Sequence, residues 1–436
     1  MKLTQRKIFF FWLPLFASWI MMTVEGPITI ATISRLPDKI EMLAAYGVVM
    51  SLSVFIESPI INLLSTSTAL VKDQTSYRLT RRFTLILISI LTLITFGIGF
   101  ITPIFDFVVL GILGVPANIA SWVQPGMQIM LLFSAAIGWR RFQQGVLINL
   151  DQGKRIAQGT GIRLVVMVVI IVGLAYFTDL PGIHVGTISI ISGIIAESLF
   201  ITWHTRRGVR SFPAEKEGDP LTMRELTWFH LPLAGTSIMI LIVQPLVSAA
   251  LARMANPTES LAVWPIIFSA MLVLRAPALS LPEVVIAKTD GADSWLPIRR
   301  FALSMTTFML VFTTVFTFTP LSDLYFMWVQ GLDAGLLIIV KQALPWLLLF
   351  PALWVVNAWL RGLLIKYRAT GAVNGSMAAN LVVTLLVLAV GISTGGSGLV
   401  IASIAMTLAA AAETIYQAWR LGIVMDGGYQ LLTGKV

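Results

Sequence analysis

The sequence predicts an all-α polytopic membrane protein with twelve transmembrane helices in two pseudo-symmetric six-helix lobes. Three observations predict this class. The 436 residues are 57% hydrophobic and only 12% charged, about half the charged fraction of ordinary soluble domains. Twelve apolar stretches are long enough to cross a bilayer, and the second half of the chain repeats the first. The apolar runs are continuous, which excludes a transmembrane β-barrel because its strands alternate apolar and polar residues.

Each predicted span rests on a run of about 20 mostly apolar residues, the length that crosses the hydrocarbon core as a helix. The first run is too long for a cleaved secretory signal, so we expect it to be retained. The runs lie at 8–34, 42–71, 83–104, 127–149, 162–178, 183–203, 228–252, 260–287, 301–320, 336–360, 371–393 and 397–419.

The orientation follows from the positions of lysine and arginine, which accumulate on the cytoplasmic side of membrane proteins. With the N-terminus inside, 25 of the 30 basic residues fall in inside segments, and Arg275 is the one basic residue within a span. Both termini are therefore predicted to be cytoplasmic, in a multi-pass protein of the bacterial inner membrane. The net charge of +9 is spread over many loops, whereas a nucleic-acid binder gathers its basic residues on one face.

An internal repeat divides the chain. Residues 11–83 align with 229–301 at an offset of 218 without a gap, with 20 identities in 73 positions that include matched prolines and arginines. We predict an N-terminal lobe at 1–205, a cytoplasmic linker at 206–227 and a C-terminal lobe at 228–436. An even number of spans in each half gives both halves the same orientation, as in parallel-repeat transporters, whose substrate sites lie between the halves.

Glu25 is the first candidate for a working residue. It lies within the first span and is followed by Pro27, which removes a backbone hydrogen bond and predicts a kink. Ionisable groups at membrane depth are costly and are functional candidates by default. A carboxylate at a kink fits proton or sodium coupling. The alternative is a glutamate that a neighbouring helix satisfies for packing alone.

Glu57 and Arg275 occupy equivalent positions in the two halves, each two residues before a proline. The repeat therefore predicts an acid and a base at related points of a shared cavity, where they form a gate or contact the substrate. The alternative is that each residue pairs within its own half.

Two further matched pairs are candidates for gates. Glu197 and Glu413 occur in one repeated pattern near cytoplasmic basic residues, which predicts an inner gate or simple charge neutralisation. Arg35 and Arg253 are equivalent residues on the predicted outer side. They are a candidate outer gate for an anion, or solvated loop charges.

Several chemistries have no motif in this sequence. The chain has no cysteine, no GxxxxGK[ST] phosphate loop and three scattered histidines without metal-ligand spacing. We therefore expect no catalytic residues, no metal site, no enzymatic activity and no cofactor beyond a coupling H+ or Na+. The expected partners are the lipid bilayer and a small-molecule substrate, for a protein that works as a monomer.

The six-plus-six spans, the proline-kinked first span with its acid and the matching seventh span resemble the multidrug/oligosaccharidyl-lipid/polysaccharide (MOP) exporter superfamily, which includes the MATE exporters. In addition, the run Glu-Met-Leu-Ala-Ala-Tyr-Gly at 41–47, separated from Glu25 by fifteen intervening residues, is similar to the first two spans of the progressive ankylosis protein (ANK) family. The resemblance implies an alternating-access exporter with a V-shaped cleft, and it adds Tyr46 to the candidate cavity residues.

The resemblance leaves three functions open. ANK relatives are associated with export of pyrophosphate, citrate or nucleotide-like anions, so our first hypothesis is an ANK-like exporter of small organic or phosphate-type anions. The alternative is a MATE-like exporter of drugs or organic cations, coupled to H+ or Na+ through Glu25. A flippase for lipid-linked precursors is the second alternative.

Overall fold

The computed structural model describes residues 3–214, 221–289, 292–367 and 369–424. Within these ranges ten helical segments are long and apolar enough to cross a membrane, or eleven when the bent pair Ala334–Leu347 and Phe350–Lys366 counts as one crossing. The remaining predicted span, 127–149, lies in a helical segment that runs from residue 117 to 149 and corresponds to the bent pair in the repeat. This count agrees with the twelve predicted spans.

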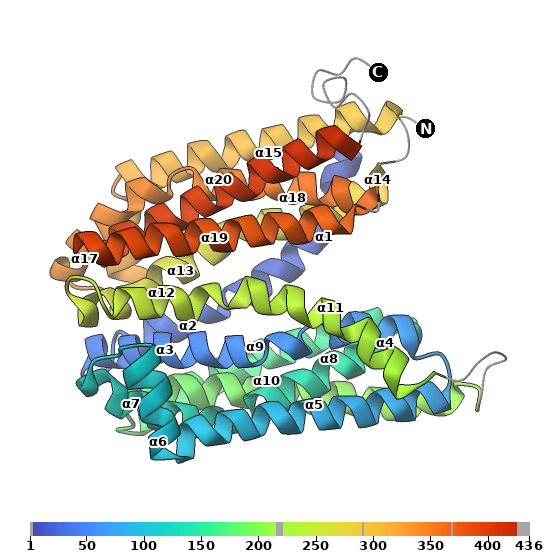
Figure 1. The fold of residues 1–436 in the computed structure, drawn as a ribbon, viewed down its shortest axis with the longest axis horizontal. Coiled ribbons are helices and arrows are strands. Elements are labelled where there is room, and N and C mark those ends of the chain that lie inside the picture. Colours follow the sequence, from blue (N-terminus) through green and yellow to red (C-terminus); the bar gives the residue numbers. More distant parts are fainter. Residues whose placement is uncertain (1–2, 215–220, 290–291, 368, 425–436) are drawn as a thin grey trace. The chain divides into compact units, whose positions relative to one another are not determined.

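The first repeat is a series of helices joined by short turns (Figure 1). Most helices start several residues before the predicted span, because polar and basic residues occupy their first turns. The elements are α1 (Gln5–Thr23), α2 (Glu25–Ile33), α3 (Lys39–Ile56), η1 (Ser58–Ile60), α4 (Leu63–Leu70), α5 (Gln74–Phe100), α6 (Thr102–Phe105), η2 (Asp106–Ile112), α7 (Ala117–Ile129), η3 (Met130–Leu132), α8 (Phe133–Asn149), α9 (Gly153–Phe177), α10 (Gly182–Gly208) and η4 (Val209–Ser211).

The second repeat reproduces the first element by element, which confirms the predicted duplication. The first residues of α11 to α15 follow those of α1 to α5 at an offset of 218, and those of α17 to α20 follow those of α7 to α10 at 217 or 216. The elements are α11 (Met223–Leu241), α12 (Val243–Leu251), α13 (Pro257–Leu279), α14 (Leu281–Lys288), α15 (Ala292–Phe318), α16 (Leu321–Asp323), η5 (Leu324–Val329), α17 (Ala334–Ala343), η6 (Leu344–Leu347), α18 (Phe350–Lys366), α19 (Thr370–Thr394) and α20 (Gly398–Val424).

Prolines break the first span of each repeat at the same point. The helix stops at Val24, three residues before Pro27, and its counterpart stops at Ile242, three residues before Pro245. Proline lacks the N–H that would bond to the carbonyl four residues earlier, and its ring clashes with that carbonyl. The helix is therefore interrupted where the proline predicts it, and the repeat contains this interruption twice.

The helices pack into two compact units. Unit 1 comprises residues 1–27 and 253–436, and unit 2 comprises residues 28–252. In unit 1, α1 packs against α13, α14 and α15; in unit 2, α11 and α12 pack against α3 and α4. These units differ from the predicted lobes at 1–205 and 228–436, because α1 in the first repeat, and α11 and α12 in the second, pack with helices of the other repeat. The predicted lobes therefore describe the duplication and not the packing.

Large apolar side chains cover the outer faces of many helices. Val165 and Val169 of α9 are 62% and 64% exposed, and Leu93 of α5 is 68% exposed. A soluble protein would not leave so much apolar surface in water. This surface is the lipid-facing side of a membrane protein.

Candidate functional site

Glu25 and Pro27 lie in the first turn of α2, directly after the break at Val24. Glu25 is half-buried, and its neighbour Gly26 lies close to α13, since a Cβ built there would be 3.5 Å from the Cβ of Ser269. The helix break thus places the carboxylate where backbone hydrogen bonding is interrupted. Arg35 and Arg253 are exposed turn residues, and Arg35 donates to the carbonyl oxygen of Ala31.

Glu57 is the C-cap residue that directly follows α3 and is 7% exposed. Its Oε2 atom is buried and has no hydrogen-bond partner among the described residues. Three arginines, Arg140, Arg141 and Arg163, interact with it electrostatically from α8 and α9. This environment fits the reading in which Glu57 balances charge within its own half. Tyr46, eleven residues earlier on α3, is buried in the same unit.

Glu197 holds together three helices of unit 2. Its side chain is fully buried on α10 and accepts hydrogen bonds from Arg140 Nη1 at 2.6 Å and Gln144 Nε2 at 3.1 Å, both on α8. Arg163 on α9 adds an ion pair at 3.6 Å from its Nε to Glu197 Oε2. A buried carboxylate is tolerated when such partners satisfy it. We name these four residues the Glu197 network.

Glu413 has the corresponding role in unit 1, where α18, α19 and α20 lie side by side (Figure 1). Its carboxylate accepts from Arg361 Nη2 at 2.8 Å on α18 and from Asn380 Nδ2 at 2.9 Å on α19. Gln417, one turn further along α20, donates to the side-chain oxygens of Glu413 and Asn357. We name these five residues the Glu413 network.

The two networks use equivalent positions with different side chains. At an offset of 217, the arginines 140 and 163 of the Glu197 network correspond to the asparagines 357 and 380 of the Glu413 network, and Gln144 corresponds to Arg361. The first network therefore contains two arginines for one glutamate, and the second contains one. Glu57 adds an acidic side chain beside the first network, whereas its equivalent in the second half, Arg275, is basic.

Arg275 lies on α13 and is surrounded by aromatic rings of unit 1. Its guanidinium carbon is 4.3 Å from the ring centroid of Trp354, 5.6 Å from that of Phe350 and 5.7 Å from that of Phe268. Arg275 makes no ion pair with a carboxylate of the described residues, and its Nε has no hydrogen-bond partner among them. The same Trp354 ring is 5.9 Å from the guanidinium carbon of Arg361, which belongs to the Glu413 network.

The sequence analysis placed Arg275 alone within a span, and this prediction is wrong. Arg140 and Arg163 are 4% and 7% exposed inside α8 and α9, and Arg361 lies inside the bent tenth span. The residues that sequence reasoning missed are the polar partners of the two glutamates and the aromatic residues around Arg275. An alignment of the two halves at an offset of 217 places polar residues of one half opposite polar residues of the other, and this alignment could have identified the partners of the glutamates.

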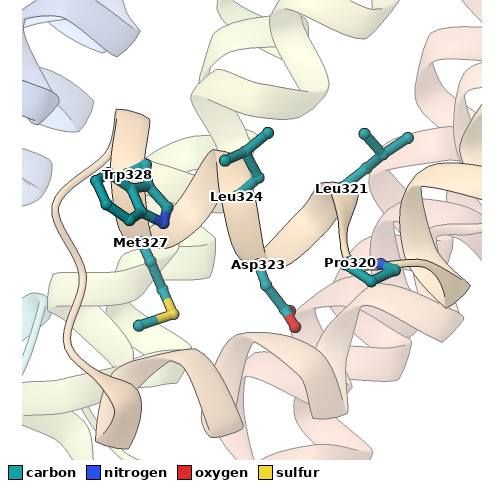
Figure 2. Close-up of a pocket in the computed structure, with 6 residues that line it drawn as sticks. All are labelled: Pro320, Leu321, Asp323, Leu324, Met327 and Trp328. Atoms are coloured by element: carbon teal, nitrogen blue, oxygen red, sulfur yellow. The ribbon is translucent and has the colours of Figure 1, made fainter.

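Possible metal sites and cavities were the remaining candidates for a ligand site among the described residues. The described residues contain no group of three histidine, aspartate or glutamate side chains placed to hold a metal ion. A cavity of about 440 Å³ lies around α16 and η5 and is lined by apolar side chains and Asp323 (Figure 2). Asp323 forms an ion pair with Lys341 at 2.6 Å. None of the predicted site residues lines this cavity.

Comparison with known proteins identifies the fold. No protein-family model and no curated protein matches the chain. Among solved structures, an inward-facing MATE family transporter of the MOP superfamily matches with a TM-score of 0.69 and 14% identity over 94% of this chain and 96% of that chain. The MATE multidrug transporter DinF-BH in complex with R6G matches with a TM-score of 0.67 and 13% identity over 98% and 96%.

A MOP superfamily transporter from Pyrococcus furiosus, described as having a binding pocket of reverse polarity, matches with a TM-score of 0.60 and 13% identity over 97% of both chains. Two compact helical units built from duplicated six-span repeats, and these matches over nearly the whole chain, show that the protein has the fold of the MATE transporters of the MOP superfamily.

Proposed function

We propose that this protein is a secondary active exporter that moves a small organic or phosphate-type anion by alternating access. The fold supports a transporter, and the absence of a phosphate-loop motif from the sequence favours coupling to an ion gradient over ATP hydrolysis. Charged side chains buried at membrane depth are costly and mark substrate or ion pathways. The sign of those charges indicates whether the transported substrate is an anion or a cation.

Arg275 is the observation that carries the anion proposal. Its three aromatic neighbours offset part of the cost of burying a cation, because a guanidinium is attracted to the face of an aromatic ring. Contacts of this kind leave the N–H donors at the edge of the guanidinium available. A carboxylate or phosphate accepts two parallel hydrogen bonds from such an edge, which is the geometry that arginine binds best. An anionic substrate would supply the counter-charge that the described residues do not place in contact with Arg275.

The charge balance supports the same choice. The two networks, together with Glu57, Arg141 and Arg275, contain five arginines and three glutamates. Arg141, Arg275 and Arg361 are half-buried, as is Glu25. When Glu25 is counted, one positive charge remains in excess, and this excess favours an anion over a cation as the transported species. The structure from Pyrococcus furiosus, with its pocket of reverse polarity, shows that pocket charge varies among proteins of this fold.

The ANK branch remains part of this proposal. It is supported by the run at 41–47 and its spacing from Glu25. The solved structures that match are MATE and MOP transporters, so the finer assignment depends on the substrate.

Transport in proteoliposomes tests the proposal. We expect export of labelled citrate or pyrophosphate by the wild type, and a loss of at least about tenfold in kcat/KM in Arg275→Gln, because a charge-assisted hydrogen bond contributes about 1.5–3 kcal/mol. Arg275→Lys keeps the positive charge but loses the paired N–H donors of the guanidinium, and it is expected to retain part of the activity. Arg224→Gln removes an exposed arginine at the start of α11 and is the matched control.

A cation exporter predicts a different pattern. If a cationic dye is exported, and Glu25→Gln abolishes this export while Arg275→Gln does not, the MATE-like alternative is correct and the anion proposal is wrong. The position of Glu25 at the α1–α2 break is the observation that favours this alternative. Anion transport that is equal in Arg275→Gln and in wild type also contradicts our proposal.

A further inference from the structure

A groove on the exposed side of α9 lies outside the site described above. It has a volume of about 590 Å³ and belongs entirely to unit 2. Six of its lining residues are on α9 and one is on α10: Arg155, Gln158, Gly161, Ile162, Val165, Val166 and Phe200. Its polar end is Arg155, whose side chain is exposed, and its apolar end is Val165.

Two local features keep the groove open. Gly161 has no side chain, and a Cβ built there would meet no atom within 4 Å, so the floor of the groove is empty at this point. Phe200 packs against His204 on its own helix, with ring centroids 4.3 Å apart. This contact holds the Phe200 ring against its own helix, α10, so the ring does not cover α9.

The equivalent surface of the second repeat is filled. There Tyr416 replaces Phe200, Gly375 replaces Gln158 and Ala372 replaces Arg155. The Tyr416 hydroxyl packs so closely on Gly375 that a Cβ at this position would overlap it. Ala372 is 2% exposed and provides no charge. The groove is thus a property of the first repeat alone and not a general consequence of the fold.

The chemistry of the groove matches one occupant. Arg155 and Val165 are ten residues apart on one helix, or about 15 Å along its axis. Beyond Val165 the lipid-facing stripe continues with Val169 and Val172, which are 64% and 48% exposed. A cation at one end and an apolar channel that opens onto the lipid-facing surface suit a phosphate group joined to an acyl chain. Basic residues at a membrane surface attract anionic lipids.

We propose that this groove binds an anionic phospholipid of the surrounding membrane, with the headgroup phosphate at Arg155 and one acyl chain passing over Gly161 toward Val165. The adjacent Lys154 is also exposed and adds positive charge at the headgroup end. The lining residues all belong to unit 2, and they include neither Arg275 and its aromatic neighbours nor any member of the two networks.

Lipid binding by purified protein in detergent tests the proposal. Dioleoyl phosphatidylglycerol and dioleoyl phosphatidylcholine are added in parallel, and the retained lipid is counted by native mass spectrometry. We expect wild type to prefer phosphatidylglycerol. Arg155→Gln should reduce that preference about fivefold, the effect of one basic residue near an anionic surface. Gly161→Leu should fill the channel and reduce binding of both lipids at this site.

Arg78→Gln is the matched control, since it removes an exposed arginine near the start of α5 that does not line the groove. Equal binding of the two lipids by wild type would overturn the proposal, as would an equal loss in Arg78→Gln and Arg155→Gln. Displacement of phosphatidylglycerol by inorganic phosphate alone would also overturn it, because the acyl chain would then contribute nothing. If Gly161→Leu does not fold, the comparison of Arg155→Gln with Arg78→Gln decides the outcome.

Discussion

At the scale of single residues, Glu197 and Glu413 show how this protein keeps charge inside a membrane. Each carboxylate lies at the junction of three helices. Glu197 accepts hydrogen bonds from α8 and forms an ion pair with α9, and Glu413 accepts hydrogen bonds from α18 and α19. Removing one member of such a buried group leaves the others uncompensated, and this is more damaging than the loss of the pair itself. Each network therefore stabilises the contact between its helices only while all of its members are present.

Glu197→Ala is expected to be strongly destabilising. It leaves Arg140 and Arg163 buried with one carboxylate fewer, and breaking a buried pair costs about 3–5 kcal/mol. Asp323→Ala is the control, because it breaks an ion pair whose side chains are 34% and 46% exposed, a change worth about 0–1 kcal/mol. Thermal unfolding in detergent measures both. An equal shift of Tm for the two variants would show that the Glu197 network has no special role in stability.

Sequence reasoning identified Glu57, Arg275, Glu197 and Glu413 because charged residues are rare within apolar runs. It did not identify their partners. Arg163 lies at the edge of an apolar stretch, where a basic residue ordinarily extends to the membrane surface, and Arg140 interrupts another stretch beside a second arginine. Only the packing of α10 against α8 and α9 shows that both turn inward. The aromatic residues around Arg275 are indistinguishable in sequence from lipid-facing ones.

At the scale of helices, close packing depends on residues without side chains. Gly145 on α8 faces α4, where a Cβ would overlap Ser67 and the carbonyl oxygen of Leu64. Small residues at helix contacts allow backbones to approach, and membrane helices use them widely. Gly173 on α9 is the opposite case, since a Cβ there would meet nothing within 4 Å.

These two glycines give a matched pair of predictions. Gly145→Ala is expected to lower the Tm, because α4 and α8 would have to move apart. Gly173→Ala is expected to keep or raise the Tm, since alanine is favoured over glycine within a helix by about 0.5–1 kcal/mol. Thermal unfolding monitored by circular dichroism compares them. A gain in stability for Gly145→Ala would contradict the close approach of α4 and α8.

The helices and their breaks were largely predictable from the sequence, since length, hydropathy and proline position are local properties. The equivalence of Pro27 and Pro245 predicted matched breaks, and both are present. The helix starts were less predictable, because α5 and α9 begin with polar turns that have no apolar signal. Nothing local in the sequence indicates that α1 packs with α13, because this contact joins residues more than 200 positions apart.

At the scale of the whole molecule, the predicted topology is open to a direct test. The chain contains no cysteine, so single cysteines can be introduced without a background. We expect Asp179→Cys, in the exposed turn between α9 and α10, to react with a membrane-impermeant maleimide in intact cells. Ser211→Cys, exposed after α10, should react only after the cells are opened. The reverse pattern would place both termini outside and refute the orientation that we predict.

The exchange of first spans between the repeats has a consequence for how such a chain arose. Unit 1 is completed by α1, and unit 2 is completed by α11 and α12. A half-length ancestor with one six-span repeat would have lacked the helix that completes its packing unit and would have obtained that helix from a second copy. We infer that duplication and fusion of the gene turned such a dimer into a single polypeptide, after which each copy could acquire its own charges, as Glu57 and Arg275 at equivalent positions show.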